Sequence, residues 1–231
     1  MSLAAEANVV SMTELVGRLQ AALLLQRAAY ARDPAPGYRQ RMADLATLRR
    51  FVIDNREALI EAVNRDYGNR SRHETLLAEL VPVLDAIRYT RRHLRAWMRP
   101  QRRRVDRLLF PGARNRVVPQ PLGVVGVIVP WNFPINLTFS ALTSIFAAGN
   151  RALVKLSENS RHFAALLLER LPRYFPREKL AVFDESGGVG AAFSRLPLDH
   201  LLFTGSTPTG RAVMAAAATG SPPWCRSARR S

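Results

Sequence analysis

The chain has 231 residues, of which 48% are hydrophobic and 23% are charged, with a formal net charge of +16. This hydrophobic content is sufficient for a packed core and excludes a wholly disordered chain. The single cysteine excludes a disulfide framework and a cysteine-rich zinc module. No apolar run reaches the ~18 residues of a membrane span, and no secretory signal precedes the first predicted helix, so we expect a cytoplasmic protein.

The positive charge is concentrated in two segments. Arg88 to Arg116 contains eleven arginines and one acid, a net +10, and residues 219–231 add +3 from three arginines. The rest of the chain carries only +3. A body so close to neutrality is not a general phosphate-binding surface, so each basic segment needs its own explanation.

Residues 1–101 predict a helical part. Apolar residues recur at helical spacing over 57–64 and 76–98. Pro82 predicts either a kink in the second helix or a helix that begins close to it. The sequence Asp33-Pro34-Ala35-Pro36-Gly37 separates an N-terminal helix from the next one, and Pro100 ends the basic helix. The predicted buried face of the helix over 76–98 consists of Leu77, Leu80, Leu84, Ile87, Leu94 and Met98.

Residues 102–122 predict an extended crossing segment with short strands. The segment alternates poorly and contains Pro111, Gly112 and Pro119. Residues 219–231 show no periodicity and end in a basic run, so we expect a disordered tail.

Residues 123–218 alternate between strand and helix patterns. Such alternation is typical of parallel strands joined by helical crossovers. The predicted fold is therefore α/β, with N-terminal helices followed by a Rossmann-like, doubly wound parallel sheet that is incomplete at its C-terminal end. The predicted strands are 124–129, 152–156, 180–183 and 200–203, and the predicted helices are 137–148, 160–174, a short helix after Gly190, and 211–218.

Polar residues follow three of these strands. They are Trp131-Asn132, Lys155 to Glu158, and Thr204-Gly205-Ser206. Open α/β sheets bind ligands at the carboxyl ends of their strands, so the three groups predict a nucleotide site. The alternative is that they are only the polar turns that commonly follow strands.

Three motifs carry a resemblance to a known family. The stretches PLGVVGVIVPWNFP, AAGNRALVKLSE and DHLLFTGST resemble the NAD(P)-dependent aldehyde dehydrogenases in order and spacing. The stretch YGNRSRHETLLAELVPVLDAIRYTRRHLRAWMRP is similar to the coniferyl-aldehyde branch, and the resemblance covers residues 15–218. It implies oxidation of a small-molecule aldehyde, such as an aromatic aldehyde, to its acid. It also implies homo-oligomers joined partly through residues 102–121.

The resemblance implies that Asn132 belongs to the oxyanion hole that stabilises the thiohemiacetal intermediate. A neutral amide donates hydrogen bonds to a developing alkoxide without losing a proton to it, which agrees with this role. The alternative is that Asn132 only caps the turn before Pro134.

The resemblance also implies a set of cofactor contacts. Glu158 would accept hydrogen bonds from ribose hydroxyls and repel a 2′-phosphate, which favours NAD over NADP, although Lys155 could offset this repulsion. Ser206 and Gly205 would contact the pyrophosphate at a helix start. The alternatives are a solvated Lys155 and an ordinary helix cap at Ser206. The implied cofactor-binding residues are Val129, Trp131, Lys155, Ser157, Glu158, Gly205 and Ser206.

The sequence also departs from the family pattern. Asp184-Glu185 stands before Gly187-Gly188-Val189-Gly190, where relatives have an early glycine, so the two acids either point to solvent or weaken cofactor binding. The motifs of the nucleophilic cysteine and the general-base glutamate are absent, and the setting of Cys225 does not match the nucleophile. We therefore expect a truncated or frameshifted chain without activity of its own. No metal site is expected, because His73, His93, His162 and His200 lack ligand spacing.

Two other functions compete with this prediction. The chain could bind a nucleotide without catalysing a reaction. It could also bind nucleic acid through Arg88 to Arg116, but this segment has few aromatic residues and similar relatives are also basic here, so we do not expect a nucleic-acid partner.

Overall fold

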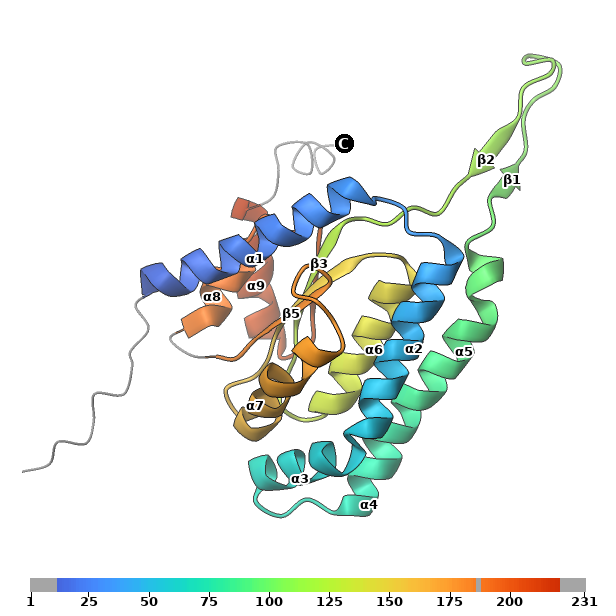
Figure 1. The fold of residues 1–231 in the computed structure, drawn as a ribbon. Coiled ribbons are helices and arrows are strands. Elements are labelled where there is room, and N and C mark those ends of the chain that lie inside the picture. Colours follow the sequence, from blue (N-terminus) through green and yellow to red (C-terminus); the bar gives the residue numbers. More distant parts are fainter. Residues whose placement is uncertain (1–11, 186–187, 221–231) are drawn as a thin grey trace, which may run out of the picture.

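The computed structural model describes residues 12–185 and 188–220, which form an α/β fold around a four-stranded parallel sheet (Figure 1). The spatial order of the strands is β5-β4-β3-β6. The chain passes outwards from β3 to β4 and β5 and then returns to β6 on the other side, so the sheet is doubly wound, as predicted. The strands are β3 (Val124–Ile128), β4 (Arg151–Lys155), β5 (Leu180–Phe183) and β6 (His200–Phe203).

The central strand β3 is buried on both faces of the sheet, and all five of its residues are buried. Val125 and Val127 belong to the core on one face, whereas Val124 and Ile128 belong to the core on the other. A continuous β-branched run predicts this double burial, because both faces of a parallel sheet are usually covered by helices.

The larger core lies between the sheet and a layer of helices. Figure 1 shows α6, α2 and α5 side by side beyond the sheet, and these helices contact one another. Phe51, Phe139, Phe146 and Phe163 are fully buried in this core. The helices of this face are α2 (Tyr38–Asp54), α3 (Arg56–Tyr67), the short α4 (Arg72–Thr75), α5 (Val81–Trp97), α6 (Pro134–Ala147) and α7 (Arg161–Arg170), which continues into the 3₁₀ turn η2 (Leu171–Arg173).

The second core covers the opposite face of the sheet. It brings α1 (Met12–Arg32) against the sheet together with α8 (Val189–Ser194), and α9 (Thr207–Gly220) packs beside α8. The side-chain nitrogen of the fully buried Gln26 donates hydrogen bonds to the backbone oxygens of Ala152 (2.8 Å) and Arg177 (3.1 Å). This contact fixes α1 along the sheet, because a buried amide N–H group without an acceptor would be costly.

A π-helical turn, η1 (Leu76–Leu80), precedes α5 and corrects one predicted core residue. Leu80, Ile87 and Leu94 are buried as predicted, but Leu77 is 70% exposed, while Leu76 packs partly against the core. The π turn places an extra residue in the helix, which rotates the preceding face away from the 3.6-residue period. α5 begins at Val81, but Leu80 and Val81 both have helical backbone angles, so α4, η1 and α5 form one continuous helical run from Arg72. The predicted helix start close to Pro82 is therefore wrong, because Pro82 lies within this run.

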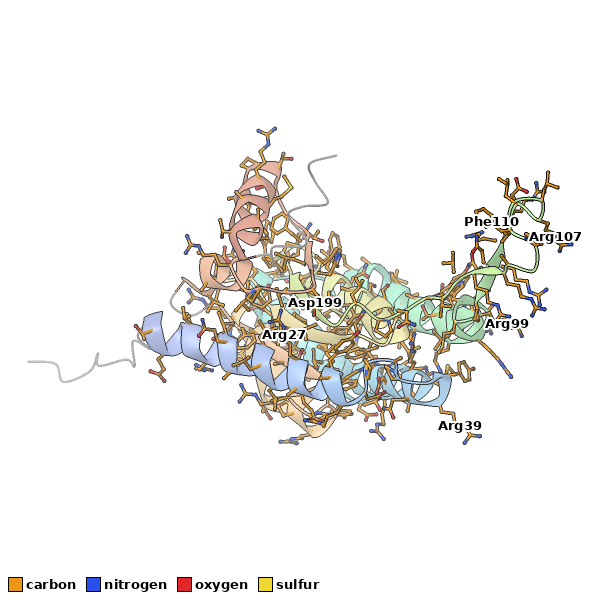
Figure 2. The ribbon with its side chains drawn as sticks, turned by 90° about the horizontal axis from the view of Figure 1, so that it is seen from above. Arg27, Arg39, Arg99, Arg107, Phe110 and Asp199 are labelled. Carbon is orange, nitrogen blue, oxygen red and sulfur yellow. The ribbon has the colours of Figure 1, made fainter. Side chains whose placement is uncertain are left out.

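The segment predicted to be extended forms an arm that projects from the body (Figure 1). Its strands β1 (Gln101–Arg103) and β2 (Asn115–Val117) pair antiparallel, which confirms the predicted short strands. Figure 2 shows Arg107 and Phe110 at the far end of the arm, and Phe110 is 60% exposed.

The helix α9 is longer than predicted at both ends, because it begins at Thr207 and ends at Gly220. Thr219 and Gly220 are therefore helical, and the remainder of the predicted tail lies outside the described residues. Among the residues that the structure describes, no helix has the length and apolar character needed to cross a bilayer.

Candidate functional site

Polar loops follow β3, β4 and β6 at one edge of the sheet, which we call the carboxyl edge. The register pairs Ile128 with both Lys155 and Phe203, and Lys155 with Phe183, so the parallel strands end level with one another. The predicted convergence of Trp131-Asn132, Lys155 to Glu158 and Thr204 to Ser206 on one edge is therefore confirmed.

Asn132 lies exposed in the loop between β3 and α6. Its side-chain oxygen accepts a hydrogen bond from the backbone N–H of Phe133 (3.1 Å), and its backbone oxygen accepts from the Tyr67 hydroxyl and from Nη1 of Arg70 (3.0 Å). Within the described part of the chain, its side-chain nitrogen donates no hydrogen bond. The predicted turn contact thus uses only the amide oxygen, and the N–H groups remain available to a negatively charged oxygen.

Arg70 supports this loop and was not predicted as a site residue. Its side chain is only 3% exposed, and its guanidinium nitrogens lie 3.3 Å from a carboxylate oxygen of Glu79 and 3.3 Å from one of Glu74. The guanidinium carbon also lies 4.6 Å from the ring centre of Tyr67 and 5.0 Å from that of Phe133. A planar guanidinium can make hydrogen bonds at its edge and stack on its face, so one side chain contacts both the ion pairs and the loop.

Glu79 connects this cluster to the start of α6. It is fully buried in η1, and Oε2 accepts hydrogen bonds from the backbone N–H groups of Ile135 (2.7 Å) and Asn136 (3.1 Å). These N–H groups lie in the first turn of α6, where a helix offers them no internal partner. Burial raises the pKa of Glu79, while the two N–H donors and the Arg70 charge act in the opposite direction.

Lys155 is buried at the end of β4, with 7% exposure, so the alternative of a solvated lysine is wrong. Its ammonium forms an ion pair with the carboxylate of Glu185, and Nζ lies 3.9 Å from Oε2 of Glu158. The second oxygen of Glu185 accepts a hydrogen bond from the backbone N–H of Gly190 (3.1 Å) at the start of α8.

The sequence left two possibilities for Asp184 and Glu185, namely that they point to solvent or that they weaken cofactor binding. The structure excludes the first possibility for Glu185. The Glu185 side chain is only 18% exposed and is directed towards the carboxyl edge, so it does not point to solvent. Asp184 is half-buried. Gly187 lies outside the described residues.

Ser157 and Glu158 continue the edge after β4. Ser157 is buried and its hydroxyl accepts a hydrogen bond from the Asn159 N–H (3.3 Å), whereas the Glu158 side chain is 60% exposed. A cleft of about 510 Å³ is lined by Glu158, Trp131 and Arg161, among others. Val129 differs from them, because its side chain is buried in the larger core and only its backbone borders the edge.

The N-terminus of α9 completes the carboxyl edge beyond β6. The Ser206 hydroxyl lies 2.9 Å from Oγ1 of Thr209 and accepts from the Thr209 N–H at 3.4 Å, so Ser206 caps α9, as its alternative interpretation predicts. A Cβ at Gly205 would lie 2.5 Å from the tip of the Phe203 ring, so a side chain at this position requires that half-buried ring to move. The backbone at a helix start can approach an anion closely where the neighbouring residue is glycine.

The donors and acceptors of the carboxyl edge fit a dinucleotide. The Ser157 hydroxyl and the Glu158 carboxylate suit the hydroxyls of a ribose, and the N-terminus of α9 beside Gly205 suits a pyrophosphate. Lys155 is the exception, because its charge is already paired with Glu185.

Among the described histidines, His162 lies near the carboxyl edge and is paired with an acid at the start of α7. Asp66 caps α7 by accepting from the backbone N–H groups of His162 (2.8 Å) and Phe163 (3.0 Å), and it also pairs with Nδ1 of His162. Across residues 12–185 and 188–220, no group of three histidine, cysteine, aspartate or glutamate side chains is placed to hold a metal ion. Cys225 lies outside these ranges.

Comparison with known proteins identifies the family and the fold. A family model described as the aldehyde dehydrogenase family matches residues 16–224. A "probable coniferyl aldehyde dehydrogenase" of Pseudomonas aeruginosa is 48% identical over 88% of this chain and 42% of that protein. The substrate-bound AldH of Staphylococcus aureus superimposes with a TM-score of 0.82 at 24% identity, over 87% of this chain and 44% of that one.

A further solved structure, PnpE in complex with nicotinamide adenine dinucleotide, gives a TM-score of 0.75 at 25% identity over 89% of this chain and 42% of that one. The chain therefore spans about two fifths of the length of the relatives that it matches.

Proposed function

The chain belongs to the aldehyde dehydrogenase family, and from this premise we propose that it supplies the cofactor site and one oxyanion donor for the NAD-dependent oxidation of an aldehyde to its acid. The observation that carries the proposal is the carboxyl edge. There, the available amide of Asn132, the pair Ser157 and Glu158, and the start of α9 follow strands that end level with one another.

In this proposal each group has a separate task. Glu158 and Ser157 bind ribose hydroxyls, Trp131 and the backbone of Val129 border the dinucleotide, and Gly205 and Ser206 bind its pyrophosphate. When bound at these residues, NAD would supply the hydride acceptor. Asn132 donates its side-chain N–H groups to the aldehyde oxygen as that oxygen becomes negatively charged.

The proposal assigns no turnover to the 231-residue chain alone. One oxyanion donor contributes about 3–4 kcal/mol of barrier lowering, whereas enzymes commonly supply ~8 kcal/mol or more. The family reaction needs a thiolate nucleophile, and the only cysteine of the chain, Cys225, has a sequence setting that does not fit this role. The nucleophile and the base would come from the part of the relatives that this chain does not span.

The substrate and the assembly are part of the same proposal. An aromatic aldehyde is supported by the relative whose name specifies coniferyl aldehyde. A homo-oligomer is supported by the arm, where Leu108 and Phe110 are 91% and 60% exposed. We expect the double variant Leu108→Ser/Phe110→Ser to reduce the sedimentation coefficient if the arm joins subunits, and an unchanged coefficient would contradict this role.

The test is a binding and turnover assay on the purified chain. We expect calorimetry to detect NAD binding, and absorbance to detect no NADH with coniferyl aldehyde present. Gly205→Ala should weaken NAD binding, because its Cβ would lie 2.5 Å from the tip of the Phe203 ring and displace that ring beside the start of α9. Gly17→Ala is the matched control, since a Cβ at Gly17 meets nothing within 4 Å. A folded chain that fails to bind NAD would refute the proposed cofactor site. Formation of NADH would refute the proposal that the nucleophile and the base come from the part of the relatives that this chain does not span.

A further inference from the structure

The carboxyl edge contains a buried ion pair whose acid the sequence comparison did not assign. Lys155 ends β4, and Glu185 lies two residues beyond the end of β5, so the neighbouring strands bring the two side chains together. Both are largely shielded, with side-chain exposures of 9% for Lys155 and 18% for Glu185.

Glu185 is held in place from a second direction. Its other oxygen accepts the Gly190 N–H, and a Cβ at Gly190 would lie 3.3 Å from the Glu185 carboxylate and 3.5 Å from Cε of Lys155. Because glycine has no side chain, position 190 leaves room for the Lys155–Glu185 ion pair, which a larger residue would crowd. With Glu158 3.9 Å from the same ammonium, two carboxylates surround one cation, so the cluster carries a net charge of −1.

We propose that Glu185 determines which dinucleotide the site accepts, by occupying the Lys155 ammonium that a 2′-phosphate would otherwise use. This inference rests on the proposed function. A 2′-phosphate would have to displace a shielded carboxylate and leave it unpaired, which is costly. A ribose with a free 2′-hydroxyl adds no charge and can hydrogen-bond to the exposed carboxylate of Glu158. The site therefore accepts NAD and rejects NADP.

Removal of the charge of Glu185 tests the inference. We expect Glu185→Gln to lower the Kd for NADP, measured by calorimetry, by about tenfold or more relative to the Kd for NAD, since a charge-assisted contact with phosphate becomes available. Glu61→Gln removes the same charge from an exposed position on α3 and should leave the ratio of the two dissociation constants unchanged.

Lys155 must be the residue that Glu185 blocks. The double variant Glu185→Gln/Lys155→Met should therefore lose the gained NADP affinity. Arg161 also lines the cleft beside Glu158. If the gain persisted without Lys155, it would arise from another cation such as Arg161, and the inference would be overturned.

A second readout is independent of nucleotide affinity. The chain has only two lysines, Lys155 and Lys179, so isotopic labelling at lysine Cε gives two assignable NMR signals. Glu185→Gln should move the Lys155 signal and leave that of Lys179 in place. NADP should then move the Lys155 signal in Glu185→Gln but not in the wild-type chain.

The outcomes separate the two proposals. If NAD binds to both proteins but the NADP to NAD ratio is the same in wild type and Glu185→Gln, only the specificity role of Glu185 fails. If neither nucleotide binds to any folded variant, the proposed cofactor site fails and the specificity role fails with it. A Lys155 signal that does not respond to Glu185→Gln overturns the ion pair on which the inference depends.

Discussion

The buried carboxylate of Glu79 gives the sharpest test of how the Asn132 loop is held. Glu79→Ala removes the acceptor for the Ile135 and Asn136 N–H groups and leaves Arg70, which is 3% exposed, without its buried partner. Each buried N–H group left without an acceptor costs about 1–3 kcal/mol, so we expect the loss of the shared acceptor to lower the free energy of unfolding by about 2–6 kcal/mol.

Glu79→Gln separates the acceptor from the charge. The amide oxygen can still accept both N–H groups, and Arg70 keeps the Asn132 oxygen at 3.0 Å and Glu74 at 3.3 Å. Burial raises the pKa of Glu79, which means that the charged carboxylate is disfavoured inside the protein. A neutral amide avoids this desolvation cost, and the saving offsets part of the attraction to Arg70 that the variant loses. We therefore expect Glu79→Gln to cost about 1 kcal/mol, the typical net value of one hydrogen bond.

The assay is urea unfolding of the variants, followed by circular dichroism. Because the folded state holds the Glu79 proton more tightly than the unfolded state, wild-type stability from this group falls as pH rises through the raised pKa and is regained at lower pH. The advantage of the wild type over Glu79→Gln should thus be largest under acidic conditions. Glu74→Gln is the control, since this 55% exposed partner should contribute less than about 1 kcal/mol. Equal losses for Glu79→Gln and Glu79→Ala would refute the argument that the acceptor dominates.

Further predictions concern packing and titration. Gly126→Ala should cost about 1–3 kcal/mol of unfolding free energy, since its Cβ would lie 2.4 Å from a leucine methyl, whereas Gly17→Ala in the open interior of α1 should stabilise by about 0.5–1 kcal/mol. Hydrogen bonds from Arg72, first, and Arg56 hold the pKa of Glu57 at about 2, so the contribution of the Glu57 carboxylate to stability is lost as pH falls towards 2. Carboxyl NMR should show that pKa return towards 4.5 in Arg72→Ala. Lysine NMR should give Lys179 a pKa below its ordinary 10.5 because it is buried, and an unshifted value would contradict the burial.

Much of the sheet could be predicted from the sequence because its signals are local. The β-branched run 124–128 requires burial on both faces, and parallel strands require helical crossovers, so the strand ends had to meet at one edge. The polar residues at Asn132 and Ser206 followed from this geometry together with their motifs. Pro82, by contrast, does not mark a helix start, because the π turn before it already has helical backbone that continues into α5.

Other features depend on contacts that no local pattern contains. The exposure of Leu77 follows from a π-helical turn, which the 3.6-residue period does not anticipate. Arg70 and Glu79 are charged and would ordinarily be expected at the surface. Both are buried because they pair with each other, and because Glu79 also accepts backbone N–H groups at the start of α6. The inward direction of Glu185 follows only once β4 and β5 are paired.

Glu79 and Glu185 are two shielded acids at the carboxyl edge that make similar contacts but have different effects. Both accept backbone N–H groups at the start of a helix, Glu79 at α6 and Glu185 at α8, and both pair with a buried cation. Arg70 also donates to the backbone oxygen of Asn132, so the Glu79 pair holds in place the residue that we propose as the oxyanion donor. The Glu185 pair instead neutralises Lys155 at the proposed nucleotide site. Changes at Glu79 should therefore alter unfolding free energy and the position of Asn132, whereas changes at Glu185 should alter the choice between nucleotides.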